Sequence, residues 1–386
     1  MQLSEGDIFK AELFEQAAKE RKDGEFSEIW DRVVANLGGD TTDEDGDAKR
    51  RNAVKQLLDS KQPGKPYSAM TELFRVYMHV LRAQHEVTYD TVGLRDFFLR
   101  GTNLGKSKIE RLKDDEEKEK IENGDWHQIG GKDKKFTWDK VMKDIESLSV
   151  VVSQFFGEED KDPYPALTNW LTAIQRLKKR DGIIPLLVWL FGNAIGKDGK
   201  IIELSSEKVK EGIHFFREIA RLSFVNSGTS KRQIFAASAA ALGHLPWSYD
   251  NDVERKRIEI EIRKKSSRNA MVYLLELLLH GGDDAGFVPL GEIEHILPKN
   301  YGGTRDGWTP AQKEEAKGQL GNLVMLEKGP NIRASDAVWT DKKEKYNGSE
   351  YEAVKKLLTI PQWTYDAFKY RQKECEYRII EFLEGK

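Results

Sequence analysis

The sequence predicts a mainly helical protein, a bundle or array of helices that ends in one small strand–loop–strand–helix unit. Up to about residue 280, apolar side chains recur with the 3.6-residue period of a helix. We find no repeat of fixed period and no alternation of strands and helices in this part. After Leu279-His280-Gly281-Gly282 the pattern changes to that of short strands and loops.

The expected helices begin at the first residues. Ser4 followed by acidic residues is typical of a capped helix start, and Ser27 is a good N-cap for a second helix that breaks at Gly38-Gly39. The acidic segment 40–47 is expected to be a loop, and the polar stretch 113–135 predicts a solvated or mobile segment. Further helices are expected over residues 49–58, 67–84, 136–154, 165–177, 183–195, 206–222 and 230–242.

Charge and cysteine usage exclude several classes of protein. The chain has 62 Lys+Arg against 65 Asp+Glu, so any contact with nucleic acid must come from a local patch. Its single cysteine, Cys375, excludes a disulfide framework and a multi-cysteine zinc site, and it fits a reducing compartment. The longest apolar run, 183–191, is far shorter than the ~20 residues of a membrane span. We therefore expect a soluble cytoplasmic protein with no membrane contact.

The C-terminal unit is predicted from alternating polar and apolar residues. Segment 287–297 alternates, with Ile293 between Glu292 and Glu294, as in a half-exposed strand. After a loop rich in glycine and proline, segment 321–326 is a second strand candidate, and a helix is expected over 330–346. This ββα unit differs from the rest of the chain, so the functional site is sought there.

Four polar residues of this unit form a chemically meaningful set. Glu294 and His295 lie side by side at a strand end, where a carboxylate can bind Mg²⁺ or Mn²⁺. An imidazole with an ordinary pKa of ~6.5 can take a proton from water at neutral pH. Asn322 and Asn331 lie nine positions apart. One amide could be a second metal ligand at a helix start, and the other could orient the imidazole through its second ring nitrogen.

This arrangement resembles the HNH, or His-Me finger, nucleases. They have an acidic residue–histidine pair ending one strand, an asparagine in the second strand, and an Asn or His on the following helix. The sequences EHILP, LGNLVML, PNIRASD and WTYDAFKYR, with the Lys342-Lys343 pair, resemble more narrowly the C-terminal domain of GmrSD-type modification-dependent restriction proteins. The phosphorothioate-sensing protein SspE shares that layout. The resemblance covers roughly residues 268–386.

The resemblance implies a ββα-metal fold and a role for each matching residue. His295 would be the general base, Asn322 would position it, and Glu294 and Asn331 would hold Mg²⁺ or Mn²⁺. Glu292 would be a secondary acidic neighbour. Candidates for phosphate contacts, on charge and position only, are Lys299, Arg333, Lys342 and Lys343. Two residues depart from the family pattern: Glu294 replaces the frequent Asp, and Asp336 stands where Asn is expected.

The resemblance also implies a domain organisation. Residues 1–20 resemble the closing segment of the family's N-terminal nucleotide-hydrolysing sensor domain, whose own motif we do not find in this chain. We expect that domain to be missing, a helical domain over 21–280 and a nuclease domain over 281–386. The implied partner is DNA, including modified phage DNA, and a homodimer is possible.

The expected function is that of a metal-dependent DNA endonuclease, the effector part of an anti-phage restriction protein. Two alternatives stay open: a non-catalytic helical module that binds DNA or a partner, and a nuclease directed at RNA. Each residue also has an alternative role. His295 could be a hydrogen-bonded strand-end histidine, Asn322 a turn residue and Asn331 a helix cap. The Lys342-Lys343 pair could be an exposed helix face and the basic run 263–268 a solvated face, and Trp308 is the tryptophan to test for DNA contact.

Overall fold

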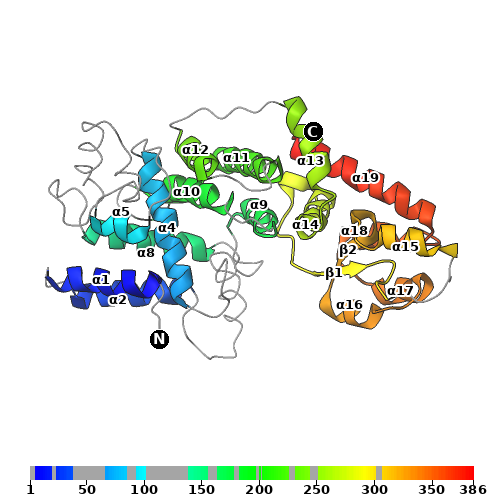
Figure 1. Cartoon of the computed structure of the whole chain (residues 1–386), viewed down its shortest axis with the longest axis horizontal. Coiled ribbons are helices and arrows are strands. Elements are labelled where there is room, and N and C mark those ends of the chain that lie inside the picture. Colours follow the sequence, from blue (N-terminus) through cyan, green and yellow to red (C-terminus); the bar gives the residue numbers. More distant parts are fainter. Residues whose placement is uncertain are drawn as a thin grey trace. The chain divides into compact units, whose positions relative to one another are not determined.

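The computed structural model describes twelve stretches of the chain: 5–19, 23–37, 66–84, 93–100, 138–154, 163–177, 182–196, 200, 202–225, 231–243, 251–300 and 307–386. The segments 40–47, 49–58 and 113–135 lie outside these described residues. Where described, the protein is mainly helical, with a small two-stranded sheet in its C-terminal part (Figure 1). The predicted fold class is confirmed in this respect. No helix in the described ranges is both long and apolar enough to span a membrane.

The chain divides into two compact units. The first unit consists of Met1–Pro163, Ile183–Lys210 and Thr229–Trp247, and the second of Tyr164–Gly182, Glu211–Gly228 and Ser248–Lys386. This division follows contacts in space, whereas the boundaries expected after residues 20 and 280 come from the resemblance and from the change in sequence pattern.

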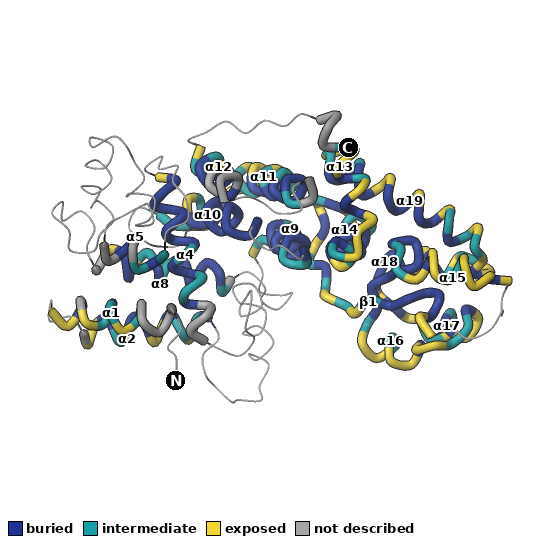
Figure 2. Tube along the Cα trace, viewed as in Figure 1, coloured by how far each residue is buried: buried dark blue, intermediate teal, exposed yellow. Residues whose placement is uncertain are grey.

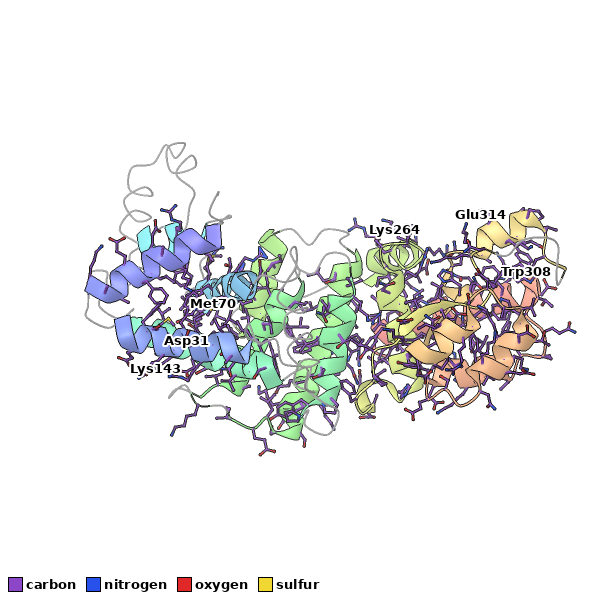
Figure 3. The ribbon with its side chains drawn as sticks, turned by 90° about the horizontal axis from the view of Figure 1, so that it is seen from below. Asp31, Met70, Lys143, Lys264, Trp308 and Glu314 are labelled. Carbon is purple, nitrogen blue, oxygen red and sulfur yellow. The ribbon has the colours of Figure 1, made fainter. Side chains whose placement is uncertain are left out.

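The first unit is a set of helices around a central one. Among the described helices, α4 (Pro66–Gln84) contacts α1 (Glu5–Lys19), α2 (Asp23–Asn36), α5 (Leu94–Arg100), α8 (Trp138–Gln154), α10 (Ile183–Ala194) and α12 (Lys231–Ala241). Its apolar positions recur at helical spacing, so one face enters the core. Met70 lies inside this unit, whereas Asp31 and Lys143 are exposed on its outer side (Figure 3).

Aromatic packing fills this core. Phe74 stacks on Trp30, with ring centroids 6.4 Å apart, and meets Phe98 edge to face at 5.7 Å. Tyr77 stacks on Phe98 at 6.1 Å. Such pairs add to the stabilisation that burial of their area already supplies. The helix α11 (Ser206–Val225) begins in the first unit and continues into the second.

In the second unit, helix α14 (Arg268–Leu279) is central. It contacts the sheet strand β2 (Leu323–Leu326) and three helices, α9 (Pro165–Gln175), α18 (Glu352–Leu358) and α19 (Tyr365–Leu383). It ends where Gly281 and Gly282 adopt φ values of 118° and 66°, a left-handed conformation that favours glycine. The remaining elements are α13 (Asn251–Glu261), the 3₁₀ turns η4 (Gly282–Asp284) and η6 (Leu320–Asn322), β1 (Glu292–His295), α15 (Pro310–Ala316), α16 (Lys328–Ala334) and α17 (Trp339–Tyr346).

Both predicted strands are present, are shorter than expected and form a hairpin. β1 and β2 pair antiparallel over four residues each, with Glu294 opposite Val324 and His295 opposite Leu323. All four residues of β2 are buried, while α15 and α16 expose most of theirs (Figure 2). β2 therefore lies in the core of this unit, whereas the short helices α15 and α16 lie at its surface.

The single helix expected over 330–346 is in fact two helices. α16 ends at Ala334, and Ser335 follows with a φ of 40°, which interrupts helical geometry. α17 then starts at Trp339. The interruption has no glycine or proline to signal it, so the sequence pattern could not reveal it.

Candidate active site

The hairpin brings the end of β1 against the start of β2. Residue Asn322 directly precedes β2, and its backbone oxygen accepts a hydrogen bond from the backbone N–H of Ile296 at 3.0 Å. Glu294 and His295 are both buried, with 6% and 8% of their surface exposed. Three of the four predicted site residues, Glu294, His295 and Asn322, therefore lie close together where the end of β1 meets the start of β2.

Glu294 is held by two side chains of helix α17. The Lys342 ammonium donates to Glu294 Oε1 at 2.5 Å, and the Tyr346 hydroxyl donates to the same oxygen at 2.8 Å. Lys342 Nζ also donates to the backbone carbonyl of His295 at 2.6 Å. Burial lowers the pKa of Lys342, although the charge of Glu294 opposes the shift, and burial raises the pKa of Tyr346.

Lys342 is therefore not a phosphate contact. Its side chain is fully buried and paired with Glu294, so it cannot reach a DNA backbone. The prediction from sequence was wrong because Lys342 shares the buried face of α17 with Trp339 and Tyr346. Spacings of three and four residues along this helix were the signal that could have indicated it.

His295 carries the chemistry expected of a general base. Its Nε2 is buried and has no hydrogen-bond partner among the described residues. Burial lowers the pKa of the ring from 6.5 to about 4, and the positive charges of Lys299, Arg268 and Lys342 act in the same direction. The ring is consequently neutral at pH 7, with a nitrogen free to accept a proton. An unpaired buried nitrogen is costly in a purely structural residue.

Asn322 does not contact the imidazole as expected. Its Oδ1 accepts from the backbone N–H of Leu297 at 2.7 Å, and its Nδ2 donates to the carbonyl of Leu297 at 3.1 Å. Both polar atoms of the fully buried Asn322 amide therefore hydrogen-bond the backbone of Leu297, two residues beyond His295. Asn322 fixes the strand end from which His295 projects, and the prediction that it orients the ring nitrogen is wrong.

Asn331 is paired with Glu292. Its Nδ2 donates to Glu292 Oε2 at 2.5 Å. The residue lies inside α16, which begins at Lys328, so it neither starts nor caps the helix. Since the amide nitrogen is used by Glu292, the oxygen of Asn331 is the atom that could face a cation. Glu292 thereby anchors a predicted metal ligand and is more than a solvated neighbour.

The donor set suits magnesium chemically. Lys342 and Tyr346 bond Oε1 of Glu294, and the second carboxylate oxygen and the Asn331 carbonyl are hard donors of the kind Mg²⁺ prefers. The described residues contain no group of three His, Cys, Asp or Glu that could hold a metal. Mg²⁺ commonly uses one or two carboxylates and keeps several waters, so such a group is not required.

The other basic candidates differ in accessibility. Lys299 and Arg333 are exposed and stay candidates for phosphate contact. Lys343 is half-buried, and its ammonium donates to the carbonyl of Ile360 at 3.1 Å while lying over the Trp339 ring. In the run 263–268, Arg263 lies in the turns between α13 and α14, is mostly exposed and pairs with Glu376, as a solvated surface residue would.

Trp308 is a packing residue. It is 1% exposed, donates through Nε1 to the carbonyl of Trp363 at 2.9 Å and meets Tyr365 edge to face. Figure 3 shows it among the C-terminal elements near Glu314 of α15. It cannot stack on a DNA base without unfolding this region.

Sequence reasoning missed two residues of helix α19 that hold the turn before β2. Arg371 donates to the carbonyls of Leu320, Gly321 and Leu323 at 3.2, 2.6 and 2.9 Å. The Gln372 side chain accepts from the N–H of Gly321. A side chain at Gly321 would place its Cβ 2.9 Å from the Gln372 backbone, so only glycine permits this approach.

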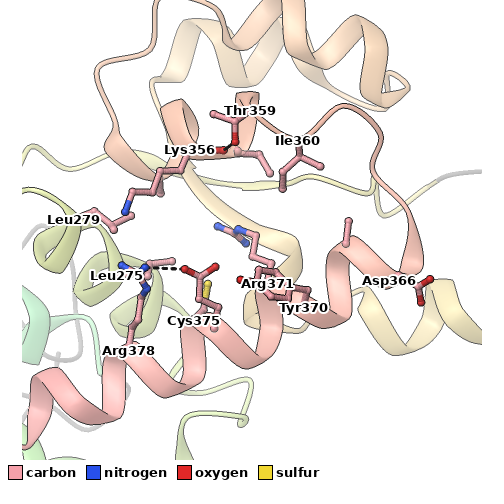
Figure 4. A pocket seen from close by; sticks show the side chains of 14 residues that line it. Leu275, Leu279, Lys356, Thr359, Ile360, Asp366, Tyr370, Arg371, Cys375 and Arg378 are labelled. Carbon is pink, nitrogen blue, oxygen red and sulfur yellow. Dashed lines mark hydrogen bonds and ion pairs between the residues drawn. The ribbon is translucent and has the colours of Figure 1, made fainter.

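A cavity of about 630 Å³ lies between α14, α18 and α19 (Figure 4). Leu275, Leu279 and Cys375 line it, with Arg371 in its wall and the Arg378–Glu374 ion pair at its side. Burial raises the pKa of the Cys375 thiol. None of the predicted catalytic residues lines this cavity, so it is distinct from the candidate active site.

The fold and the hairpin define a helical domain with a buried acid–histidine pair on a two-stranded sheet. Residues 247–375 match the family model of the GmrSD restriction endonucleases, C-terminal domain. The match confirms, for this part of the chain, the resemblance predicted from the motifs, and a domain of restriction endonucleases implies nuclease activity with DNA as the substrate. No curated protein matches the chain by sequence.

Proposed function

We propose that this protein is a metal-dependent DNA endonuclease of the HNH type and acts as the effector part of a restriction protein directed at phage DNA. The observation that carries the proposal is the buried His295, whose Nε2 has no partner among the described residues and whose ring is neutral at pH 7. It lies next to Glu294 on a strand end held by Asn322. This supports general base catalysis at the hairpin.

In this proposal each residue has one task. His295 takes a proton from the water that attacks the phosphodiester, at its Nε2. Glu294 and Asn331 supply the oxygen atoms that hold Mg²⁺ or Mn²⁺. Once bound, the cation stabilises the charge of the pentacoordinate phosphate and of the leaving oxygen. Asn322 keeps the strand end in place, and the exposed Lys299 and Arg333 contact DNA phosphates.

The test is plasmid cleavage by purified His295→Ala protein. A general base contributes about 10²–10⁴ to the rate, so the variant should nick supercoiled plasmid slower by at least that range. His214→Ala is the matched control, because His214 is an exposed histidine of the same unit. If His295→Ala cleaves as fast as the parent, the proposal is wrong.

Chelation separates the proposal from its rivals. EDTA should abolish cleavage of DNA by the parent while leaving DNA binding through Lys and Arg intact. A module that only binds DNA would show no cleavage with or without metal. A preference for single-stranded RNA over plasmid in the same assay would instead favour an RNA-directed nuclease.

A further inference from the structure

Helix α17 contributes a buried cation to the candidate active site. Lys342 is fully buried, and its ammonium contacts both members of the acid–histidine pair, through Glu294 Oε1 and the His295 carbonyl. The Tyr346 hydroxyl, one helical turn further, reaches the same Glu294 oxygen. α17 also contacts α16, the helix that carries Asn331.

This pairing meets the needs of a buried carboxylate. An ionised side chain that leaves water needs a counter-charge and hydrogen bonds to remain charged. Glu294 obtains both, the charge from Lys342 and a further hydrogen bond from Tyr346. The two contacts therefore offset the cost of burying this carboxylate and hold it in place.

The pairing uses only one of the two oxygens of the Glu294 carboxylate. Both donors meet Oε1, which fixes the carboxylate in one orientation. The other oxygen of Glu294 is then held at a constant place relative to the His295 backbone, which the same ammonium bonds. Residues that hydrogen-bond a metal-binding carboxylate in this way orient it, and their loss typically weakens metal affinity 10–100-fold.

We propose that Lys342 and Tyr346 are positioning residues, which fix the Glu294 carboxylate for a divalent cation. The proposal rests on the proposed function, in which Glu294 is a metal ligand. It assigns Lys342 a task inside the site, opposite to the DNA contact that its charge suggests. A plain structural ion pair would stabilise the fold without changing metal affinity.

The experiment measures Mn²⁺ binding by the full chain, with isothermal titration and with the EPR signal of free Mn²⁺. Lys342→Met removes the ammonium at similar length, and Tyr346→Phe removes only the hydroxyl. We expect Lys342→Met to weaken Mn²⁺ affinity 10–100-fold and Tyr346→Phe to weaken it less. The Mn²⁺ concentration for half-maximal plasmid nicking should rise by the same factor.

Lys343→Met is the matched control. Lys343 is the next residue of the same helix, but its ammonium bonds Ile360 and not Glu294. This variant should bind Mn²⁺ as the parent does. Circular dichroism and thermal unfolding of each variant establish that the protein measured is folded.

Unchanged or tighter Mn²⁺ binding by folded Lys342→Met would overturn the proposal, because the lysine would then be structural or a competitor of the metal. Should Lys342→Met not fold, Tyr346→Phe decides, and unchanged affinity in that variant overturns the proposal as well. A parent protein that neither binds Mn²⁺ nor cleaves DNA would refute the proposed function itself. Binding and cleavage by the parent, with a Lys342→Met variant equal to it, would refute this inference alone.

Discussion

The two compact units bury different kinds of side chain. In the described part of the first unit the core is aromatic and aliphatic, and the buried polar residues are His79, Arg82, Ser149 and Ser238. The second unit buries many more polar residues, and several of them carry charge: Arg221, Glu261, Glu276, Glu294, Lys342, Arg371 and Glu376.

The first unit buries side chains mainly for packing, whereas the second also buries charged groups that hold other polar groups in place. Apolar burial stabilises a fold without fixing any reactive group. Buried charges cost free energy unless they are paired, and proteins tolerate them chiefly where the position of a polar group matters. The contacts of Lys342 with Glu294 and of Arg371 with the turn before β2 are of this second kind. Substitutions in the first unit should therefore affect stability alone, and those in the second should also affect cleavage.

The largest effect on stability is expected from Phe74→Ala in the first unit. The ring is fully buried between Trp30 and Phe98, so its removal should cost about 3–5 kcal/mol of unfolding free energy. Hydrogen exchange should show faster exchange in α4, while plasmid cleavage per folded molecule at low temperature stays at the parent rate. Phe74→Leu should lose less stability. A fall in cleavage by folded Phe74→Ala would show that the first unit shares in the reaction.

A smaller loss of stability with a kinetic signature is expected from Asn322→Ala. The backbone N–H and carbonyl of Leu297 lose their buried partner, which costs about 1–3 kcal/mol. Because the strand end that carries His295 is loosened, kcat should fall while KM for DNA stays unchanged. Asn347→Ala, an exposed residue of the same unit, is the control. Equal kcat in folded Asn322→Ala and in the parent would limit Asn322 to a structural role.

The smallest effect concerns the pH dependence of stability in metal-free protein. Since the pKa of His295 falls from 6.5 to about 4 on folding, the unfolded chain binds a proton more readily. The stabilisation is fully present above pH 6.5 and is lost as the pH falls towards 4, by about 1–2 kcal/mol between pH 7 and pH 5. The free energy of unfolding, measured with urea between pH 7 and pH 5, should fall by this amount more in the parent than in His295→Gln. Parallel curves would show that the ring is not desolvated on folding.

Much of the secondary structure was predictable because it depends on local periodicity. The helix expected over 67–84 is α4 within one residue, and the helix expected over 136–154 ends as predicted at Gln154. The two hairpin strands were also expected, from alternation around Ile293 and from the apolar run after Asn322. The division of 330–346 into two helices was not predictable, because Ser335 adopts a positive φ without a glycine at that position.

The sequence indicated which residues belong to the candidate site, but it did not indicate which side chains hydrogen-bond to them. The short motifs singled out Glu294, His295, Asn322 and Asn331, and the family match supports the domain that contains them. Their roles in catalysis and metal binding stay predictions. The partners come from distant parts of the chain: Lys342 lies 48 residues from Glu294, and Arg371 lies 50 residues from Gly321.

The sequence by itself determined that the chain is helical, that a hairpin interrupts the helices near its end, and which residue types there can bind a cation or move a proton. These follow from periodicity and from side-chain chemistry, which are properties of neighbouring residues. Only the tertiary structure decided that Lys342 faces a carboxylate, that Asn322 bonds backbone, and that Asn331 is anchored by Glu292. The physical reason is that burial and partner choice depend on which helix face packs against the hairpin.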